Sequence, residues 1–164
     1  MLKLGLRVAA VTLMLDQLSK WILIYVVNMP DRPIIEVTSN FNLRMVWNRG
    51  VSFGMFSADT ETGRYALIAF ALIVVTILLF WLIRAKSRLL GWAIGLVVGG
   101  AIGNVIDRWF YGAVADFFDL HALGYHFYTF NIADMAITFG VVLLILESLL
   151  TGQDEIRAKA GQNT

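Results

Sequence analysis

The chain has 164 residues, of which 59% are hydrophobic and 15% charged, with a formal net charge of +1. Water-soluble domains usually have about a quarter charged residues, so the mean hydropathy of +0.72 excludes an ordinary soluble protein and indicates a membrane protein. The near-neutral charge gives no sign of nucleic-acid binding, and the absence of cysteine excludes disulfides, thiolate metal sites and a cysteine nucleophile.

Four apolar segments are long enough to cross a bilayer, which takes about 17–25 helical residues. We place these spans at residues 8–27, 65–83, 89–106 and 133–150. The first span is interrupted by Asp16 and is not followed by a signal-peptide cleavage site, so we expect it to be retained. The sequence therefore predicts an α-helical integral membrane protein with four transmembrane helices, forming a single membrane domain over residues 1–164.

Basic residues gather at one side of the predicted bundle. They precede the first span, connect the second to the third and follow the fourth: Lys3, Arg7, Arg84, Lys86, Arg88, Arg157 and Lys159. Cytoplasmic segments of membrane proteins are enriched in lysine and arginine. We therefore expect both termini in the cytoplasm and the segments 28–64 and 107–132 on the outer side.

The first outer segment alternates between apolar and polar residues from Phe41 to Asn48. A period of two is typical of a strand with one apolar face. We expect a small extracytoplasmic β-sheet, whose apolar face either packs on the helix ends or contacts substrate at the membrane surface.

The third span has a glycine at every fourth position, at Gly91, Gly95, Gly99 and Gly103. Such a stripe of small residues lets a neighbouring helix approach closely. We therefore expect this face of the third span to pack against another helix.

Several charged and polar residues lie inside the spans, where each charge costs about 2.5–3.5 kcal/mol at the bilayer centre. Asp16 and Lys20 are four residues apart, a spacing that favours an ion pair on a helix. A direct role in an active site is the alternative. Asn104 and Arg108 share a helix face beside Asp107 and could form a network that holds other carboxylates in place.

Two further aspartates lie on the expected outer side, near the ends of spans. Asp134 begins the fourth span, where Asn131 can cap the helix, so capping alone could explain it. Asp116 has small or apolar neighbours and no such explanation, and Asp119 is a lower-ranked candidate for its place. Two carboxylates in a site of low dielectric constant share one proton. One can then activate water while the other donates a proton, as in aspartic proteolysis.

Four short blocks, in this order along the chain, resemble the lipoprotein signal peptidase (signal peptidase II) family of bacteria. They are 16-DQLSK-20, 48-NRGVSFG-54, 103-GNVIDR-108 continuing to 112-GAVADF-117, and 130-FNIAD-134. The second block departs mildly from the family, which often has two alanines before the phenylalanine where this chain has Val51-Ser52.

The resemblance implies an aspartic endopeptidase of the cytoplasmic (inner) membrane that removes the signal peptide from prolipoproteins. Cleavage would fall just before a diacylglyceryl-modified cysteine, on the outer side of the membrane, without a metal or cofactor. The family's catalytic aspartates match Asp116 and Asp134. Its supporting or substrate-binding positions match Asp16, Lys20, Asn48, Asn104, Asp107, Arg108 and Asn131. The implied partners are prolipoproteins carrying diacylglyceryl-cysteine and membrane lipids, and the oligomeric state stays open.

Other functions are consistent with the residues taken alone. Ser52 and Lys20 could form a Ser-Lys hydrolytic dyad. His121 and His126 could bind a metal, although they lack the H-E-x-x-H pattern of metalloproteases. The acids of the spans could instead serve a small transporter or channel, which would move ions and cut no peptide.

Overall fold

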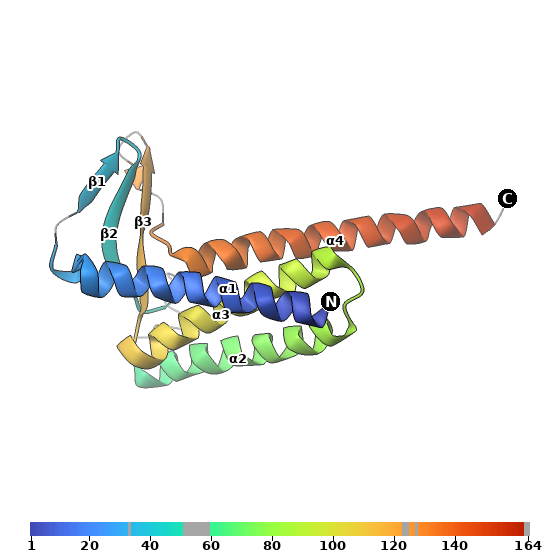
Figure 1. Cartoon of the computed structure of the whole chain (residues 1–164), viewed down its shortest axis with the longest axis horizontal. Helices are drawn as coiled ribbons and strands as arrows, with labels where there is room; N and C mark the ends of the chain where they lie inside the picture. The colour runs from blue at the N-terminus through green and yellow to red at the C-terminus, as the bar shows by residue number, and fades with distance from the viewer. Residues whose placement is uncertain (33, 51–59, 123–124, 127, 163–164) are drawn as a thin grey trace.

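Four long helices run side by side, and a small β-sheet lies at one end of them (Figure 1). The computed structural model describes residues 1–32, 34–50, 60–122, 125–126 and 128–162. The helices are α1 (Leu2–Trp21, continued by a π-helix over Ile22–Val26), α2 (Glu61–Arg84), α3 (Arg88–Tyr111) and α4 (Ile132–Gln162). All four are long and apolar enough to cross a membrane, which confirms the predicted transmembrane helices.

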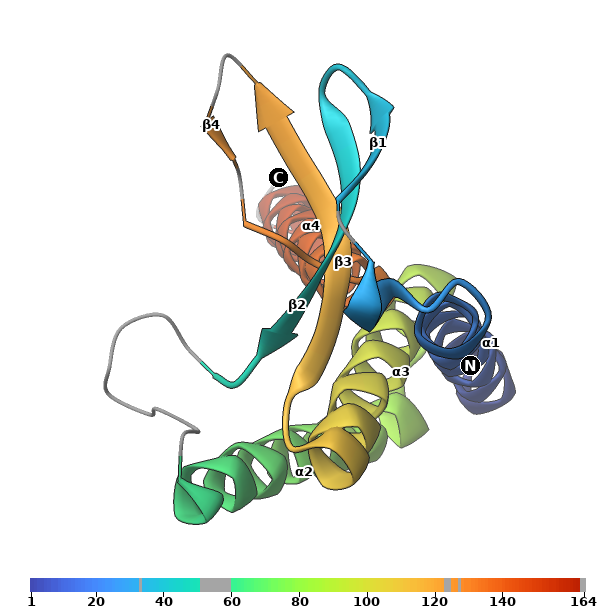
Figure 2. The ribbon, with the colours of Figure 1, turned by 90° about the vertical axis from the view of Figure 1, so that its left-hand side faces the viewer.

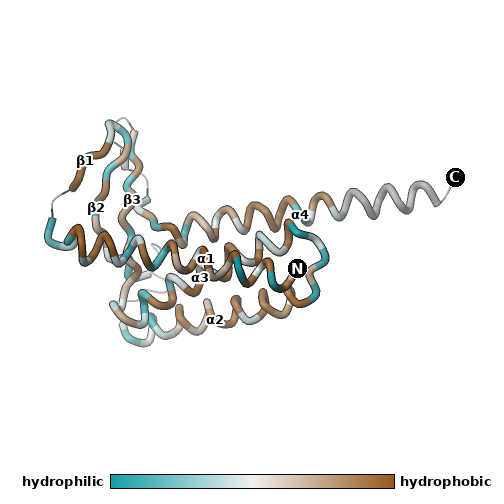
Figure 3. The backbone as a smooth tube through the Cα atoms, in the orientation of Figure 1, coloured by the Kyte–Doolittle hydropathy of each residue, from teal (hydrophilic) through white to brown (hydrophobic). Residues whose placement is uncertain are grey.

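Figure 3 shows apolar residues along the length of the helices and hydrophilic residues at the connection between α2 and α3. Side chains on the outer helix faces are apolar and exposed, such as Phe70 of α2 at 67% and Phe139 of α4 at 59%. Lipid tails can solvate such faces, and the backbone polar groups are satisfied within each helix.

The centre of the bundle is α3, which packs against each of the other three helices (Figure 2). The most apolar stretch of α3 is 56% buried, whereas the corresponding stretches of the other helices are 17% to 33% buried. Leu82 of α2 and Ile94 of α3 are among the most buried apolar side chains of this core.

The glycine stripe of α3 faces α1. A Cβ atom added at Gly95 would lie 2.6 Å from the carbonyl oxygen of Gly5, and one at Gly99 would lie 2.6 Å from that of Ala9. Only glycine permits so close an approach of the two backbones. The prediction of a packing face on the third span is therefore confirmed.

The sheet has the strand order β1-β2-β3-β4, and all its pairs are antiparallel. Its strands are β1 (Ile35–Thr38), β2 (Phe41–Asn48), β3 (Val114–Ala122) and the short β4 (Tyr125–His126). The strand predicted from Phe41 to Asn48 is confirmed as β2.

The alternation in β2 does not produce one buried apolar face. Asn42 is only 7% exposed, whereas Trp47 is 37% exposed. The register against β3 shifts between Leu43 and Val46, because three steps along β2 match two along β3. A bulge of this kind adds a residue and reverses the alternation beyond it.

The end of α3 delivers the chain into β3. Gly112 has φ +75°, the left-handed conformation that ends many helices and that glycine adopts most easily. Two residues later β3 begins, and it carries Asp116 along the sheet at the end of the bundle.

Candidate active site

Asp116 and Asp134 are joined by one side chain at the sheet end of the bundle. Asp116 of β3 is 1% exposed, and Asp134 is half-buried in the first turn of α4. Asn131 Nδ2 donates to Asp116 Oδ1 at 2.7 Å, and Asn131 Oδ1 accepts from the Asp134 backbone N–H at 2.9 Å. The backbone N–H of Asn131 also donates to Asp134 Oδ2 at 3.4 Å. The predicted cap of α4 is confirmed, and the same residue holds the second aspartate.

Backbone pairing with β3 places Asn131 in this position. The Phe118 N–H donates to the Phe130 carbonyl at 2.9 Å, and the Phe130 N–H donates to the Phe118 carbonyl at 3.1 Å. The residue after Phe130 therefore lies beside the strand segment that carries Asp116. The chain then turns into α4, which brings Asp134 within reach one helical turn later.

Asn48, at the end of β2, holds the other oxygen of Asp116. Its Nδ2 donates to Asp116 Oδ2 at 2.9 Å and also to the hydroxyl of Tyr128. Its Oδ1 accepts from the Gly50 backbone N–H at 3.0 Å, which sets the orientation of the amide. Gly50 has φ +141°, a conformation that L side chains rarely adopt. Each oxygen of Asp116 thus receives one amide N–H.

Asn104 of α3 plays the corresponding part for Asp134. Its Nδ2 donates to Asp134 Oδ1 at 2.9 Å. Its Oδ1 accepts from Asn131 Nδ2 at 3.2 Å and from Lys20 Nζ at 3.3 Å. Because both of these partners are donors, the amide nitrogen of Asn104 must point at the aspartate.

Lys20 lies at the centre of a buried group of charges behind the aspartates. It pairs with Asp16 at 2.8 Å, as predicted, and also with Asp107 of α3 at 2.7 Å. Asp16 Oδ1 accepts from the Ala133 backbone N–H at 2.9 Å, and Asp107 Oδ2 accepts from that of Ala115 at 3.1 Å. The two acids thereby hold the residues next to Asp134 and Asp116.

Gln17 completes this group and was not singled out from the sequence. Its Nε2 donates to Asp107 Oδ1 at 3.0 Å and to the Gly103 carbonyl at 3.2 Å. Its position next to Asp16, inside an apolar span, is the signal that could have drawn attention to it.

Arg108 lies one helical turn beyond Asn104, on the side of the aspartates. Its Nη1 donates to the Asn104 carbonyl at 3.4 Å, and its charge acts on Asp134, Asp107 and Asp116. Its Nε is buried and has no hydrogen-bond partner among the residues that the structure describes. The guanidinium therefore has donor capacity to spare close to the aspartates.

Asp119, the lower-ranked alternative to Asp116, is fully buried on the same strand. It lies opposite Asn42 in β2, whereas Asp116 lies opposite Val46. Its Oδ2 is 3.8 Å from Nε of Arg44.

Two pockets open beside the aspartates. One, of about 310 Å³, is lined by Asp116 and Arg44, and the other, of about 500 Å³, is lined by Asp134 and Phe139. Asn48 and Tyr128 line both pockets, so they separate the two spaces. Tyr128 belongs to no motif in the sequence, and only the folded chain brings it here.

Burial raises the pKa of the Asp116 carboxyl from 3.8 to about 7, because the charged form is poorly solvated there. The hydrogen bond from Asn48 opposes this rise, and the negative charge of Asp134 adds to it. Burial likewise raises the pKa of the Tyr128 hydroxyl, with contributions from both aspartates. Near neutral pH the pair of carboxyls can therefore hold a single proton.

The structure also bears on the alternative Ser-Lys and histidine sites. Ser52 and the Val51-Ser52 departure lie outside the described residues, while Lys20 is engaged with two carboxylates. His121 and His126 lie opposite each other on β3 and β4. Within the described ranges, no group of three or more His, Asp or Glu side chains is arranged to hold a metal ion.

The chain is similar to known proteins over most of its length. A family model described as signal peptidase (SPase) II matches residues 8–150. A lipoprotein signal peptidase of Methylobacterium sp. (strain 4-46) is 47% identical over 146 residues, covering 89% of this chain and 88% of that protein. One of Rhizorhabdus wittichii is 43% identical over 157 residues, covering 95% and 91%.

Two solved structures, each described as a bacterial membrane enzyme, have the same arrangement of the chain. One has a TM-score of 0.78 at 29% identity and covers 92% of this chain and 90% of its own. The other has a TM-score of 0.75 at 30% identity and covers 88% and 92%.

Proposed function

The chain belongs to the signal peptidase II family, and from this premise we propose that Asp116 and Asp134 are its catalytic pair. It is a membrane aspartic peptidase that processes prolipoproteins. The observation that carries the proposal is the Asn131 side chain, which is hydrogen-bonded to Asp116 and to the backbone of Asp134. Cleavage falls just before the diacylglyceryl-modified cysteine.

The pair divides the chemistry between an acid and a base. Asp116, with a pKa of about 7, carries the shared proton and acts as the acid, and Asp134 acts as the base. Asp134 takes a proton from water as the water oxygen attacks the peptide carbonyl, and Asp116 protonates the carbonyl oxygen. Asp134 then gives its proton to the departing amine as the C–N bond breaks, while Asp116 recovers a proton from the tetrahedral diol.

The remaining polar residues orient this pair or bind substrate. Asn48, Asn104 and Asn131 direct amide N–H groups at the two aspartates. The ion-paired residues Asp16, Lys20 and Asp107 brace the segments on either side. Arg108, whose Nε has no hydrogen-bond partner in the described part of the chain, is suited to a carbonyl oxygen of the substrate backbone.

The larger of the two pockets supports a lipid-bearing substrate. It runs from Asp134 over Met135, Thr138 and Phe139. These three positions follow the i, i+3, i+4 spacing of one helix face, and all three are exposed on the outside of α4. A signal helix and the two acyl chains on the cysteine can thus reach the aspartates sideways from the bilayer.

We place this end of the bundle on the outer side of the inner membrane. The N-terminus and the α2–α3 connection lie at the opposite end of the helices from the sheet (Figure 1), and Lys3 and Arg7 belong to the first turns of α1. The excess of basic residues there favours a cytoplasmic location for that end and for both termini.

The test is cleavage of a diacylglyceryl-modified precursor and its unmodified twin by the purified protein. We expect cleavage of the modified precursor alone, immediately before the cysteine. D116N and D134N should each lower the rate by about 10²–10⁴-fold, the usual contribution of a general acid or base. D119N is the matched control, since it removes a buried carboxylate from the same strand and should leave most of the activity.

The same variants distinguish a peptidase from a transporter or channel. In proteoliposomes, D116N and D134N should abolish cleavage without altering ion flux. Ion conduction through these carboxylates, with no cleavage of the lipidated precursor by the unmodified protein, would overturn the proposal.

A further inference from the structure

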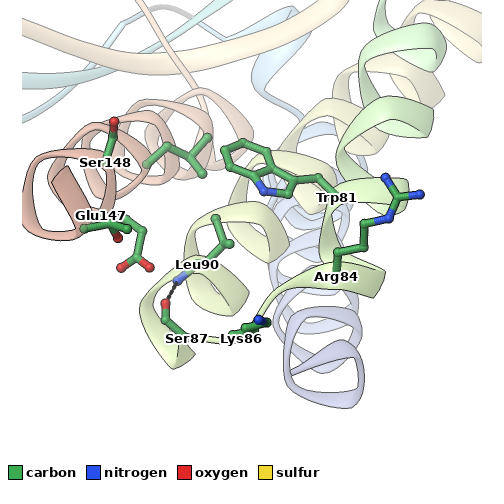
Figure 4. A pocket seen from close by; sticks show the side chains of 9 residues that line it. Trp81, Arg84, Lys86, Ser87, Leu90, Glu147 and Ser148 are labelled. Carbon is green, nitrogen blue, oxygen red and sulfur yellow. Dashed lines mark hydrogen bonds between the residues drawn. The ribbon is translucent and has the colours of Figure 1, made fainter. Parts of the chain in front are cut away.

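A separate pocket of about 650 Å³ lies beside the α2–α3 connection, at the end of the bundle away from the sheet and the aspartates (Figure 1). Figure 4 shows the side chains that line it. It is bounded by the end of α2, the α2–α3 connection and the last apolar turns of α4. None of its lining residues belongs to the candidate active site, so the proposed reaction gives it no role.

The pocket carries opposite charges on opposite sides. Arg84 and Lys86 come from α2 and the connection that follows it, and both are exposed. Glu147 comes from α4 and is half-buried. Figure 4 shows the Glu147 carboxylate on the α4 side, with Lys86 and Ser87 on the connection.

These charges do not neutralise each other. Among the described residues, Glu147 forms no ion pair and no hydrogen bond with a basic side chain. It lies within the apolar part of α4, Ile132–Thr151, where an unpaired charge is costly. A ligand that brings a positive group to Glu147 and a negative group to Arg84 and Lys86 would remove that cost.

The pocket lining also includes large apolar side chains. Trp81 is 46% exposed, and Leu90 and Leu144 add to the apolar lining, beside the hydroxyl groups of Ser87, Ser148 and Thr151. Tryptophan is enriched where membrane proteins meet the boundary between lipid tails and headgroups. The location, at the end of membrane-spanning helices, therefore suits a lipid with its head in the pocket and its tails along α2 and α4.

We propose that this pocket binds a phospholipid whose headgroup carries both a phosphate and a primary ammonium group, namely phosphatidylethanolamine. The phosphate faces Arg84 and Lys86, and the ammonium donates to the Glu147 carboxylate. Phosphatidylglycerol lacks the cation, so Glu147 repels it. Phosphatidylcholine has a quaternary nitrogen with no N–H to donate.

The test is lipid binding to the purified full-length protein in detergent, measured by native mass spectrometry. The three lipids are compared with identical acyl chains. We expect phosphatidylethanolamine to bind about fivefold more tightly than the other two, the upper range for a partly exposed charge pair. R84Q combined with K86Q should weaken binding by about fivefold for each basic residue removed. E147Q should bring phosphatidylethanolamine and phosphatidylglycerol to similar affinities.

Controls separate this site from general effects of charge and folding. K3Q removes an exposed basic residue at the same end of the bundle but outside this pocket, and should keep the preference. The ratio of two bound lipids is measured on the folded fraction alone. A variant that folds poorly therefore still gives its lipid preference. Soluble glycerophosphoethanolamine should bind far more weakly, because it lacks the acyl chains.

Equal binding of the three lipids by the unmodified chain would overturn the proposal, as would an E147Q variant with an unchanged preference. Binding of the soluble headgroup as tightly as the lipid would show that the ligand is not a lipid. Both pocket variants should still cleave a lipidated precursor in detergent, so this proposal and the catalytic one fail independently.

Discussion

At the scale of single residues, three asparagines determine how the two aspartates can work. Asn48, Asn104 and Asn131 each direct an amide N–H at a carboxylate oxygen. The acceptor oxygen of each amide is already occupied, which removes the alternative orientation of the side chain. The aspartates are thus held before substrate binds, so the proposed reaction would need little reorganisation.

The first prediction at this scale concerns pH. If Asp116 is the acid, cleavage should fall as pH rises through about 7, because the carboxyl then loses its proton. The stability of the fold should change in the same direction. The pKa of Asp116 is raised in the folded state, so the contribution of its protonated carboxyl to the free energy of unfolding is present at low pH and is lost as pH rises through about 7. A profile of kcat/KM against pH measures the basic limb.

N48A sharpens this test. The hydrogen bond from Asn48 lowers the pKa of Asp116, so its loss should move the basic limb to higher pH. We expect a shift of about one unit, since a hydrogen bond to a charged group contributes about 1.5 kcal/mol. A limb that stays in place or moves to lower pH would contradict the assignment of Asp116 as the acid.

At the scale of elements, the bundle depends on how closely α1 and α3 approach. The Cβ of an alanine at Gly99 would lie 2.6 Å from the Ala9 carbonyl oxygen, so one helix would have to move. At Gly91, in the same stripe, the nearest atom is a Leu4 methyl at 3.5 Å, an ordinary contact. The helix contact therefore requires glycine at Gly99, whereas Gly91 has room for the methyl group of an alanine.

This difference predicts opposite results for two similar substitutions. G99A should lower the free energy of unfolding by about 1–3 kcal/mol, the usual cost of overpacking. G91A should be neutral or stabilising, because alanine is a better helix former than glycine by up to about 1 kcal/mol. Thermal unfolding in detergent measures both, and equal losses of stability would show that the contact distance is not the cause.

At the scale of the whole molecule, one buried charge group connects the helices to both aspartate-bearing segments. Lys20 of α1 pairs with Asp107 of α3, and the two acids it neutralises accept backbone N–H groups next to Asp134 and Asp116. The group therefore couples the stability of the bundle to the geometry of the candidate active site.

Replacing Lys20 tests this coupling. K20M leaves Asp16 and Asp107 buried without a cation, which should cost about 3–5 kcal/mol of stability. Cleavage should fall as well, since Asp16 and Asp107, which hold the two aspartate-bearing segments, lose the cation between them. K3M, which changes an exposed lysine at the far end of α1, is the control and should alter neither quantity. A K20M variant as stable as the unmodified chain would exclude the bracing role.

What could be predicted from the sequence is what depends on neighbouring residues along the chain. The four spans follow from local hydropathy, and β2 follows from its alternation. The Asp16–Lys20 pair and the Asn131 cap each lie within one helical turn. In every case the interacting groups are brought together by the geometry of a single element.

The tertiary structure alone decided the contacts between distant parts of the chain. The second ion pair of Lys20, the meeting of Asn131 with Asp116, and Tyr128 between the two pockets all depend on how the helices and the sheet pack. The same is true of Glu147 and Lys86, which line one pocket from α4 and from the α2–α3 connection. Such contacts depend on how one element is positioned along its neighbour. That position is determined by the shapes as well as the polarities of the packed side chains, so no local periodicity of the sequence predicts it.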